Sequence, residues 1–254
     1  MTKEHLLKVL EKGIRYDGRK LTEYRPIKIE TNISKSAEGS AKITIGETEL
    51  IAGVKLGIET PYPDTPNQGN LMVNVELLPM SNSEFEVGPP GDNAVELARV
   101  VDRGIRESKA INTKKLCVKE KEKVWSVMID ICTINAAGGL FDAATLGAIA
   151  ALQSTTMPKL EETTVNYDEK TKEKLPITRD PITVTVYKIG PYLIVDPLPE
   201  EEKEADARLT IALTRENTIC ALQKGGTEPL TTEIIEQMIT IAQEKAPQLR
   251  KHLK

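Results

Sequence analysis

The chain has 254 residues, of which 39% are hydrophobic and 28% charged, and its formal net charge is −4. This length and apolar content exclude a disordered chain and predict one large α/β domain or two small lobes around a proper core. Because the whole-protein charge does not attract anions, any nucleic-acid site would have to be a local basic patch.

The cysteines and histidines exclude several kinds of site. Cys117, Cys132 and Cys220 are widely spaced and odd in number, which argues against a disulfide framework or a zinc site and favours a reducing cytoplasm. His5 and His252 lie near the ends of the sequence, where chains tend to fray, so a histidine-dependent triad or metal site is not expected. We expect no resident metal and no cofactor.

The first half of the chain reads as strands around one arginine-containing helix. It opens with an amphipathic helix that has no signal-peptide core, and no apolar run approaches about 18 residues, so no membrane segment is expected. Alternating β-branched residues predict an antiparallel meander over RPIKIETNI and GSAKITIGETELIAGVKLGIE, with a turn near Gly46-Glu47. A loop over residues 60–70 separates this meander from a further predicted strand, LMVNVELLPM. A helix follows from about Ala94 to Ala110, with Asp92 or Asn93 as its N-cap.

A buried strand, WSVMIDICTINAAG, then leads into GGLFDAATLGAIAAL. This segment is predicted to be a helix buried nearly all round, because it carries no charge between Asp142 and Lys159. The polar stretch near residues 160–180 is the predicted lobe boundary.

Two hairpins and a final helix are predicted beyond that boundary. The hairpins turn at Gly190-Pro191 and Glu216-Asn217, and the helix runs from about Thr231 to Ala246. The predicted fold class is α+β, a two-lobe α/β arrangement of two mixed sheets, each packed with helices. The lobes comprise residues 1–165 and 166–254 within one compact unit.

Three arginines of the first long helix, Arg99, Arg103 and Arg106, fall within one narrow sector at 100° per residue. They have two interpretations. The first is a solvated face with ion pairs inside the helix, which involve Glu96, Asp102 and Glu107. The second is a track for a phosphate backbone, since guanidinium groups bind phosphate well.

The glycine turn before the buried helix raises the question of an anion site. A helix N-terminus offers unpaired N–H groups, and an anion site there normally adds Arg, Lys, Ser or Thr. Here Gly139 is followed by Leu140, Phe141 and Asp142. We expect the Asp142 carboxylate to cap the helix and to close this turn to phosphate.

A second polar cluster, VDPLPEEEKEADAR, is rich in carboxylates. Asp196 and Glu202 could ligate Mg²⁺ or act as general acids. The same cluster could equally be a solvent-exposed acidic loop, and its spacing leaves both interpretations open.

Five segments in register resemble the RNase PH family. They are GIRYDGRKLTEYRPIKIE, GSAKITIGETELIAGVKLG, ELARVVDRGIRESKAI, AAGGLFDAATLGAIAAL and VDPLPEEEKEADARLTIALT. The resemblance runs from about Gly13 to Ala246. It implies an RNase PH-like fold and hexameric rings of phosphorolytic 3′→5′ exoribonucleases or their relatives.

The resemblance also implies residue roles that this sequence meets unevenly. The arginine that holds the attacking phosphate in active members falls on Phe141, which leaves a degenerate phosphate site at Gly139, Phe141 and Asp142. Counting from Asp196, the other acids of the active family fall on Glu202 and Arg208, which form a degenerate acidic site. The arginine helix matches well, so the resemblance favours RNA contact by Arg99, Arg103 and Arg106.

This combination resembles the non-catalytic PH-type ring subunits of the archaeal exosome. It implies an RNA-binding subunit that pairs with a catalytic PH-type sister in a heterohexamer, a trimer of heterodimers, with possible RNA-binding cap proteins. The alternative is an active phosphorolytic or Mg²⁺-dependent exoribonuclease that uses Asp196 and Glu202. A stand-alone two-lobe scaffold unrelated to RNA is the third hypothesis.

Overall fold

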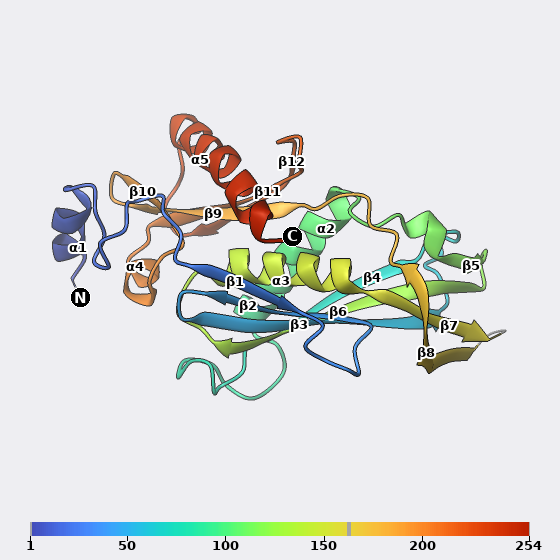
Figure 1. Ribbon diagram of the computed structural model, residues 1–254. Coiled ribbons are helices and arrows are strands. Elements are labelled where there is room, and N and C mark those ends of the chain that lie inside the picture. The colour runs from blue at the N-terminus through green and yellow to red at the C-terminus, as the bar shows by residue number, and fades with distance from the viewer. Residues whose placement is uncertain (1, 162–163, 254) are drawn as a thin grey trace.

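The computed structural model describes residues 2–161 and 164–253 (Figure 1). The helices are α1 (Lys3–Leu10), α2 (Asp92–Glu107), α3 (Leu140–Ser154), α4 (Pro199–Lys203) and α5 (Thr232–Arg250), with 3₁₀ turns η1 (Thr113–Leu116) and η2 (Lys251–Leu253). The strands are β1 (Ile27–Thr31), β2 (Gly39–Ile45), β3 (Thr48–Glu59), β4 (Asn70–Glu76), β5 (Cys117–Lys119), β6 (Lys123–Asn135), β7 (Thr156–Glu161), β8 (Thr164–Lys174), β9 (Ile182–Ile189), β10 (Tyr192–Val195), β11 (Ala207–Leu213) and β12 (Ile219–Gly226). The predicted α+β class is confirmed.

The larger sheet of the described residues has the strand order β1-β2-β3-β6-β4, with β5 beside β6. The predicted antiparallel meander is correct for β1, β2 and β3. The strand β4, predicted only as a further strand, pairs with β6 in parallel. A parallel pair needs a long crossover, and here α2 and the segment after it provide one between β4 and β6.

The second sheet has the order β10-β9-β11-β12, and every neighbouring pair is antiparallel. The prediction of a mixed sheet is therefore wrong for this half of the molecule. Both predicted hairpins are present. Gly190 and Asn217 occupy the turns with φ of +56° and +58°. The left-handed region is accessible to glycine and asparagine at little cost.

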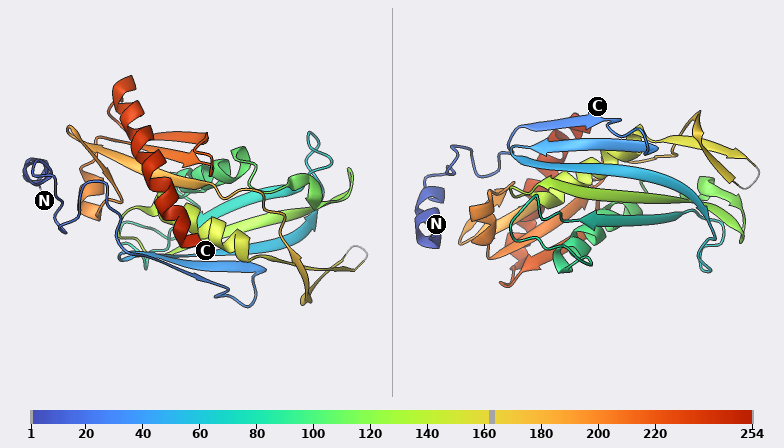
Figure 2. Two further views of the ribbon diagram at one scale, coloured as in Figure 1. Left: turned by 45° about the horizontal axis from the view of Figure 1, so that its top comes forward. Right: turned by 90° about the horizontal axis from the view of Figure 1, so that it is seen from below.

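The stretch predicted as a boundary forms the β7–β8 hairpin, which projects from one end of the molecule (Figure 2). Residues 162 and 163 of that stretch lie outside the described residues. A division between residues 165 and 166 would fall inside β8, and we retain it as a proposal for the two lobes.

Helix α3 lies between the two sheets (Figure 1). Every residue from Phe141 to Leu152 is buried, as predicted from the absence of charge. Gly147 allows the close approach, because an added Cβ would lie 2.9 Å from Leu50 Cδ1 and 3.0 Å from Ile43 Cγ1. The core is therefore built around this one helix.

Helix α2 packs against β4, α3 and β12, and thus spans both halves of the molecule. Its N-cap is Gly91 and no side chain caps it, so the prediction of Asp92 or Asn93 is wrong. Asp92 instead lies in the first turn, where a negative charge is favourable.

Helix α5 crosses β9 and β11 and continues past the predicted end to Arg250. Among the described residues, no helix is both long and apolar enough to cross a bilayer.

We expect Gly147→Ala to destabilise the fold by about 1–3 kcal/mol, because the extra methyl group overpacks the contact between α3 and the larger sheet. The matched control is Gly104→Ala on α2, where the added Cβ would lie 3.7 Å from Ala212 Cβ, an ordinary contact. The control should gain about 0.5–1 kcal/mol from helix propensity. Urea unfolding measures both, and equal stabilisation by the two variants would contradict this packing analysis.

Candidate functional site: the glycine turn and the arginine helix

The turn before α3 presses against the start of the acidic segment. Gly138 and Gly139 have φ of +83° and +69°. An added Cβ at Gly138 would collide with Pro197 O, and one at Gly139 would lie 2.8 Å from Asp196 Oδ1. Both glycines are required by backbone conformation and by space. The turn and the acidic segment are thereby held in direct contact.

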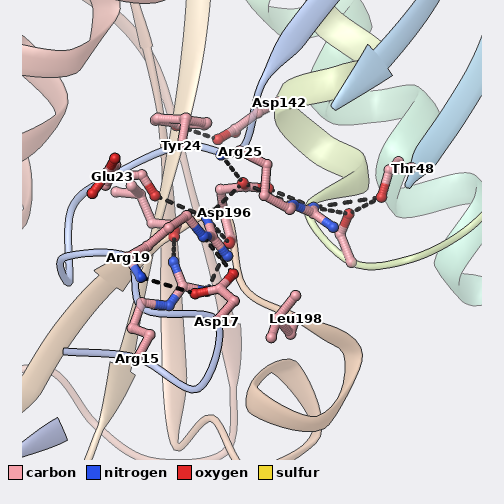
Figure 3. Close-up of polar contacts among 12 residues, drawn as sticks. Arg15, Asp17, Arg19, Glu23, Tyr24, Arg25, Thr48, Asp142, Asp196 and Leu198 are labelled. Carbon is pink, nitrogen blue, oxygen red and sulfur yellow. Dashed lines mark hydrogen bonds and ion pairs between the residues drawn. The ribbon is translucent and has the colours of Figure 1, made fainter. Parts of the chain in front are cut away.

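Asp196 is buried at 2% exposure and is surrounded by arginines (Figure 3). Arg25 donates to its carboxylate from the backbone N–H at 2.8 Å, from Nε at 2.9 Å and from Nη2 at 2.6 Å. Arg19 Nη1 adds a contact of 2.9 Å to Oδ2. Both carboxylate oxygens are therefore occupied by cations from the N-terminal segment.

The neighbouring acid Glu201 is equally committed. It is fully buried and pairs with Arg15, which also donates to Val195 O and Asp196 O at 2.8 Å. The interpretation of this cluster as a solvent-exposed acidic loop is wrong for Asp196 and Glu201. The roles of Arg15, Arg19 and Arg25 were not predicted; the available signal was the presence of three arginines within the short segment before β1.

Asp142 does not cap α3, contrary to prediction. Its carboxylate accepts hydrogen bonds from Tyr24 Oη at 2.6 Å and from Thr185 Oγ1 at 2.7 Å. Thr185 Oγ1 lies 3.0 Å from Thr210 Oγ1. Burial raises the pKa of the Asp142 carboxyl from 3.8 to about 7, although both hydrogen bonds oppose the rise. Tertiary partners on β9 and before β1 thus replace the expected local cap.

Glu202 provides the carboxylate that the turn was predicted to receive from Asp142. It accepts a hydrogen bond from Tyr187 Oη at 2.7 Å, and it lies close enough to the Gly139 backbone N–H for that group to lower the pKa of the carboxyl. Burial raises the pKa of the Glu202 carboxyl, and these two groups partly offset the rise. An internal carboxylate therefore occupies the helix N-terminus at the position where a bound anion would lie.

Phe141 and Arg208 contact each other, and both line a small cavity. The Arg208 guanidinium carbon lies 4.1 Å from the centre of the Phe141 ring, and Arg208 Nη2 lies 2.5 Å from Glu96 Oε2 on α2. The cavity measures about 290 Å³, and Glu202 and Lys203 also line it. We call the group Gly139, Phe141, Asp142, Asp196, Glu202 and Arg208 the glycine-turn site; the structure brings all six together.

The arginine face, defined as Arg99, Arg103 and Arg106, lies apart from that cavity along α2. Arg106 is paired with Asp102 at 2.7 Å and donates to Leu71 O at 3.0 Å. Arg99 is exposed beside a groove of about 640 Å³ between α2 and β4. Within the part of the chain that the structure describes, neither Arg99 nor Arg103 has an ion pair.

The predicted ion pairs inside α2 are thus correct for Asp102 alone. Glu96 pairs with Arg208 instead, and Glu107 is exposed. The arginine face therefore carries two cations that no described carboxylate neutralises, and one that is compensated.

Comparison with known proteins identifies the fold. Residues 23–158 match domain 1 and residues 181–245 match domain 2 of the 3′ exoribonuclease family, the RNase PH family. The chain belongs to this family. The resemblance inferred from the five sequence segments is confirmed. Residues 159–180, which include most of the β7–β8 hairpin, lie between the two matches of the 3′ exoribonuclease family.

Members of this family from archaea are similar over the full length. A protein of Sulfurisphaera tokodaii described as "Exosome complex component Rrp42" is 45% identical, with 100% of this chain and 94% of the relative covered. Its namesake in Methanopyrus kandleri is 43% identical, with 99% and 95% covered. A solved structure described as "archaeoglobus fulgidus exosome with RNA bound to the active site" superposes with a TM-score of 0.92 at 40% identity, covering 99% of this chain and 97% of that one.

We expect Asp142→Asn to change how stability depends on pH. The folded pKa lies above the unfolded value, so wild-type stability relative to the variant should fall as the pH rises from about 4 to about 7 and then stay level. The full difference is on the order of 4 kcal/mol. Denaturant unfolding between these pH values measures it, with the exposed-loop variant Asp64→Asn as control. If the unfolding free energies of Asp142→Asn and wild type depended on pH in the same way, the raised pKa of the Asp142 carboxyl would be refuted.

Removing the Asp196 carboxylate should be far more damaging than removing a surface acid. Asp196→Ala leaves the buried guanidinium of Arg25 without its partner, and we expect a loss of about 3–5 kcal/mol in unfolding free energy. Glu84→Ala, which breaks an exposed ion pair with Lys203, should lose at most about 1 kcal/mol. Similar losses for both variants would show that Asp196 does not stabilise the fold as described.

Proposed function

We propose that this chain is a non-catalytic, RNA-binding structural subunit of an archaeal-type exosome ring. It pairs with a catalytic PH-type sister in an alternating hexamer and helps to shape the sister's site for phosphorolytic 3′→5′ RNA degradation. The family is shared with 3′ exoribonucleases, and relatives at 43–45% identity over the full length carry the description of exosome components.

The observation that carries the non-catalytic assignment is the composition of the glycine-turn site. The resemblance implies an arginine that holds the attacking phosphate, and that position is Phe141, which offers no donor. The Glu202 carboxylate already lies close enough to the Gly139 N–H for that group to lower its pKa. A phosphate entering here would compete with Glu202 for this N–H and would face its carboxylate, which is electrostatically unfavourable.

The acidic residues support the same conclusion. The alternative, an active exoribonuclease acting through Asp196 and Glu202, requires carboxylate oxygens that can reach a metal or a proton. Asp196 accepts hydrogen bonds on both oxygens from Arg19 and Arg25. Releasing it would leave two buried guanidinium groups unpaired, at a cost of several kcal/mol.

The arginine face supports RNA binding without catalysis. Uncompensated Arg99 and Arg103 can neutralise phosphates of a single strand, and such contacts are insensitive to sequence. Arg106 contributes less in this proposal, because Asp102 compensates its charge. We assign the RNA track chiefly to Arg99 and Arg103, with Arg106 at its end.

The remaining parts of the proposal concern the surroundings of the ring. RNA is the substrate of the assembled complex, cap proteins that bind RNA would sit on the ring, and the site of action is the cytoplasm. Cys117, Cys132 and Cys220 are free thiols, which is compatible with a reducing compartment.

The decisive test compares two charge changes in the ring reconstituted with a catalytic PH-type sister. Arg99→Glu should cut the rate of phosphate-dependent RNA degradation, because it places a negative charge on the RNA track. Glu202→Gln removes the charge, keeps one acceptor oxygen and nearly the same shape, and should leave the rate near that of the wild-type ring. The salt dependence of RNA binding should weaken by about 0.7 in slope for each phosphate contact removed by Arg99→Ala or Arg103→Ala.

The chain alone, assayed with phosphate, is the control and should release no nucleoside diphosphate from RNA. A large loss from Glu202→Gln with little effect of Arg99→Glu would favour the nuclease alternative. An unchanged salt slope in both alanine variants would mean that the arginine face is only a solvated surface.

A further inference from the structure

Glu96 on α2 is held by residues from two strands of the second sheet. Arg208 Nη2 on β11 lies 2.5 Å from Glu96 Oε2, and Gln223 Nε2 on β12 donates to Glu96 Oε1 at 3.2 Å. Glu96 belongs to the N-terminal half of the chain, whereas both donors come from the C-terminal half. One side chain thus fixes α2 against the other half of the molecule.

Arg208 is itself fixed in place. Its side chain is only 14% exposed, and its guanidinium stacks on the Phe141 ring at 4.1 Å. On the Gly225 side there is no room for a side chain, because an added Cβ would lie 2.5 Å from Arg208 Cζ. A guanidinium held between an aromatic ring and a backbone loses little further freedom when it forms an ion pair.

The geometry connects this contact to the arginine face. Glu96 and Arg103 are seven residues apart, about two helical turns, and therefore lie on the same side of α2. Arg103 lines a small crevice together with Gln223, the residue that also holds Glu96. Arg103 has no ion pair of its own among the described residues, so its direction depends on how α2 is seated.

We infer that Arg208 and Glu96 are positioning residues for RNA binding: their ion pair seats α2 so that Arg103 and Arg99 point along one track. The inference rests on the proposed function, because it requires α2 to contact RNA. In this arrangement the glycine-turn site has a structural role. Phe141 and Arg208 form a support for the arginine helix rather than a pocket for a ligand.

The test uses the ring assembled with the catalytic sister and compares Arg208→Met, Glu96→Gln and the double variant. Each single variant should raise the KM for RNA about 3- to 10-fold, and kcat should stay unchanged because the reacting groups lie in the sister. The slope of RNA affinity against salt should fall by about 0.7, the value for one lost phosphate contact on a single strand. The double variant should lose no more than the worse single variant, since both changes break one interaction.

Arg215→Met is the matched control, because Arg215 also pairs with a carboxylate, that of Asp180, at 2.5 Å, but lies in the turn after β11. It should leave KM and the salt slope unchanged. Glu96→Gln retains the hydrogen bond from Gln223 and keeps the test valid if Arg208→Met fails to fold, which the thermal unfolding of each chain reports.

Two results separate this inference from the proposed function. If Arg99→Ala and Arg103→Ala weaken RNA binding while Arg208→Met and Glu96→Gln do not, the positioning role is wrong and the RNA track stands. If none of the four changes the binding, the RNA track fails as well. Equal effects of Arg208→Met and Arg215→Met, or additive losses in the double variant, would also overturn the positioning role.

Discussion

The fold depends on the buried contact between Asp196 and Arg25. The two residues are 171 positions apart, and they join the segment before β1 to the strand end after β10. Arg25 also donates to Ala137 O at 2.6 Å and to Gly138 O at 3.1 Å. The glycine turn, and with it the start of the buried helix α3, is therefore oriented by an ion pair between the segment before β1 and the segment after β10. Because α3 lies between both sheets, this contact also determines how the halves meet.

Charge in and around the glycine-turn site is almost fully neutralised from within. Asp196 faces Arg19 and Arg25, Glu201 faces Arg15, and Glu96 faces Arg208. Asp142 differs, because its described partners are two hydroxyl groups, and burial raises its pKa to about 7. A site whose cations are already paired has little field left to attract a phosphate. The proposed lack of phosphate binding therefore rests on this internal pairing as well as on the replacement of a single residue.

The parts of the fold predicted correctly are those set by local sequence. The two turns of the second sheet followed from Gly190 and Asn217, and the burial of α3 followed from its lack of charge. The errors concern partners that are distant in sequence. No residue near Asp142 in the sequence indicates that its carboxylate accepts hydrogen bonds from Tyr24 and Thr185. Nor does any indicate that the carboxylate near the Gly139 N–H is that of Glu202. The parallel pairing of β4 with β6 was missed for the same reason, since a crossover is a property of topology and not of strand pattern.

The arginine at this site comes from a different half of the molecule than the resemblance to the family implies. The resemblance implies an arginine in the turn and an acid on the strand, whereas this chain has Phe141 in the turn and Arg208 on β11. The guanidinium stacks on the phenyl ring and faces Glu96 rather than a ligand. Among the described residues, Arg208 Nη2 has its ion pair with Glu96 inside the chain, whereas Arg208 Nη1 is buried without a hydrogen-bond partner. A surface whose supporting contacts are formed in advance has less to order when it binds; under the proposed function, the contacts of Arg208 with Phe141 and Glu96 would give α2 this advantage toward RNA.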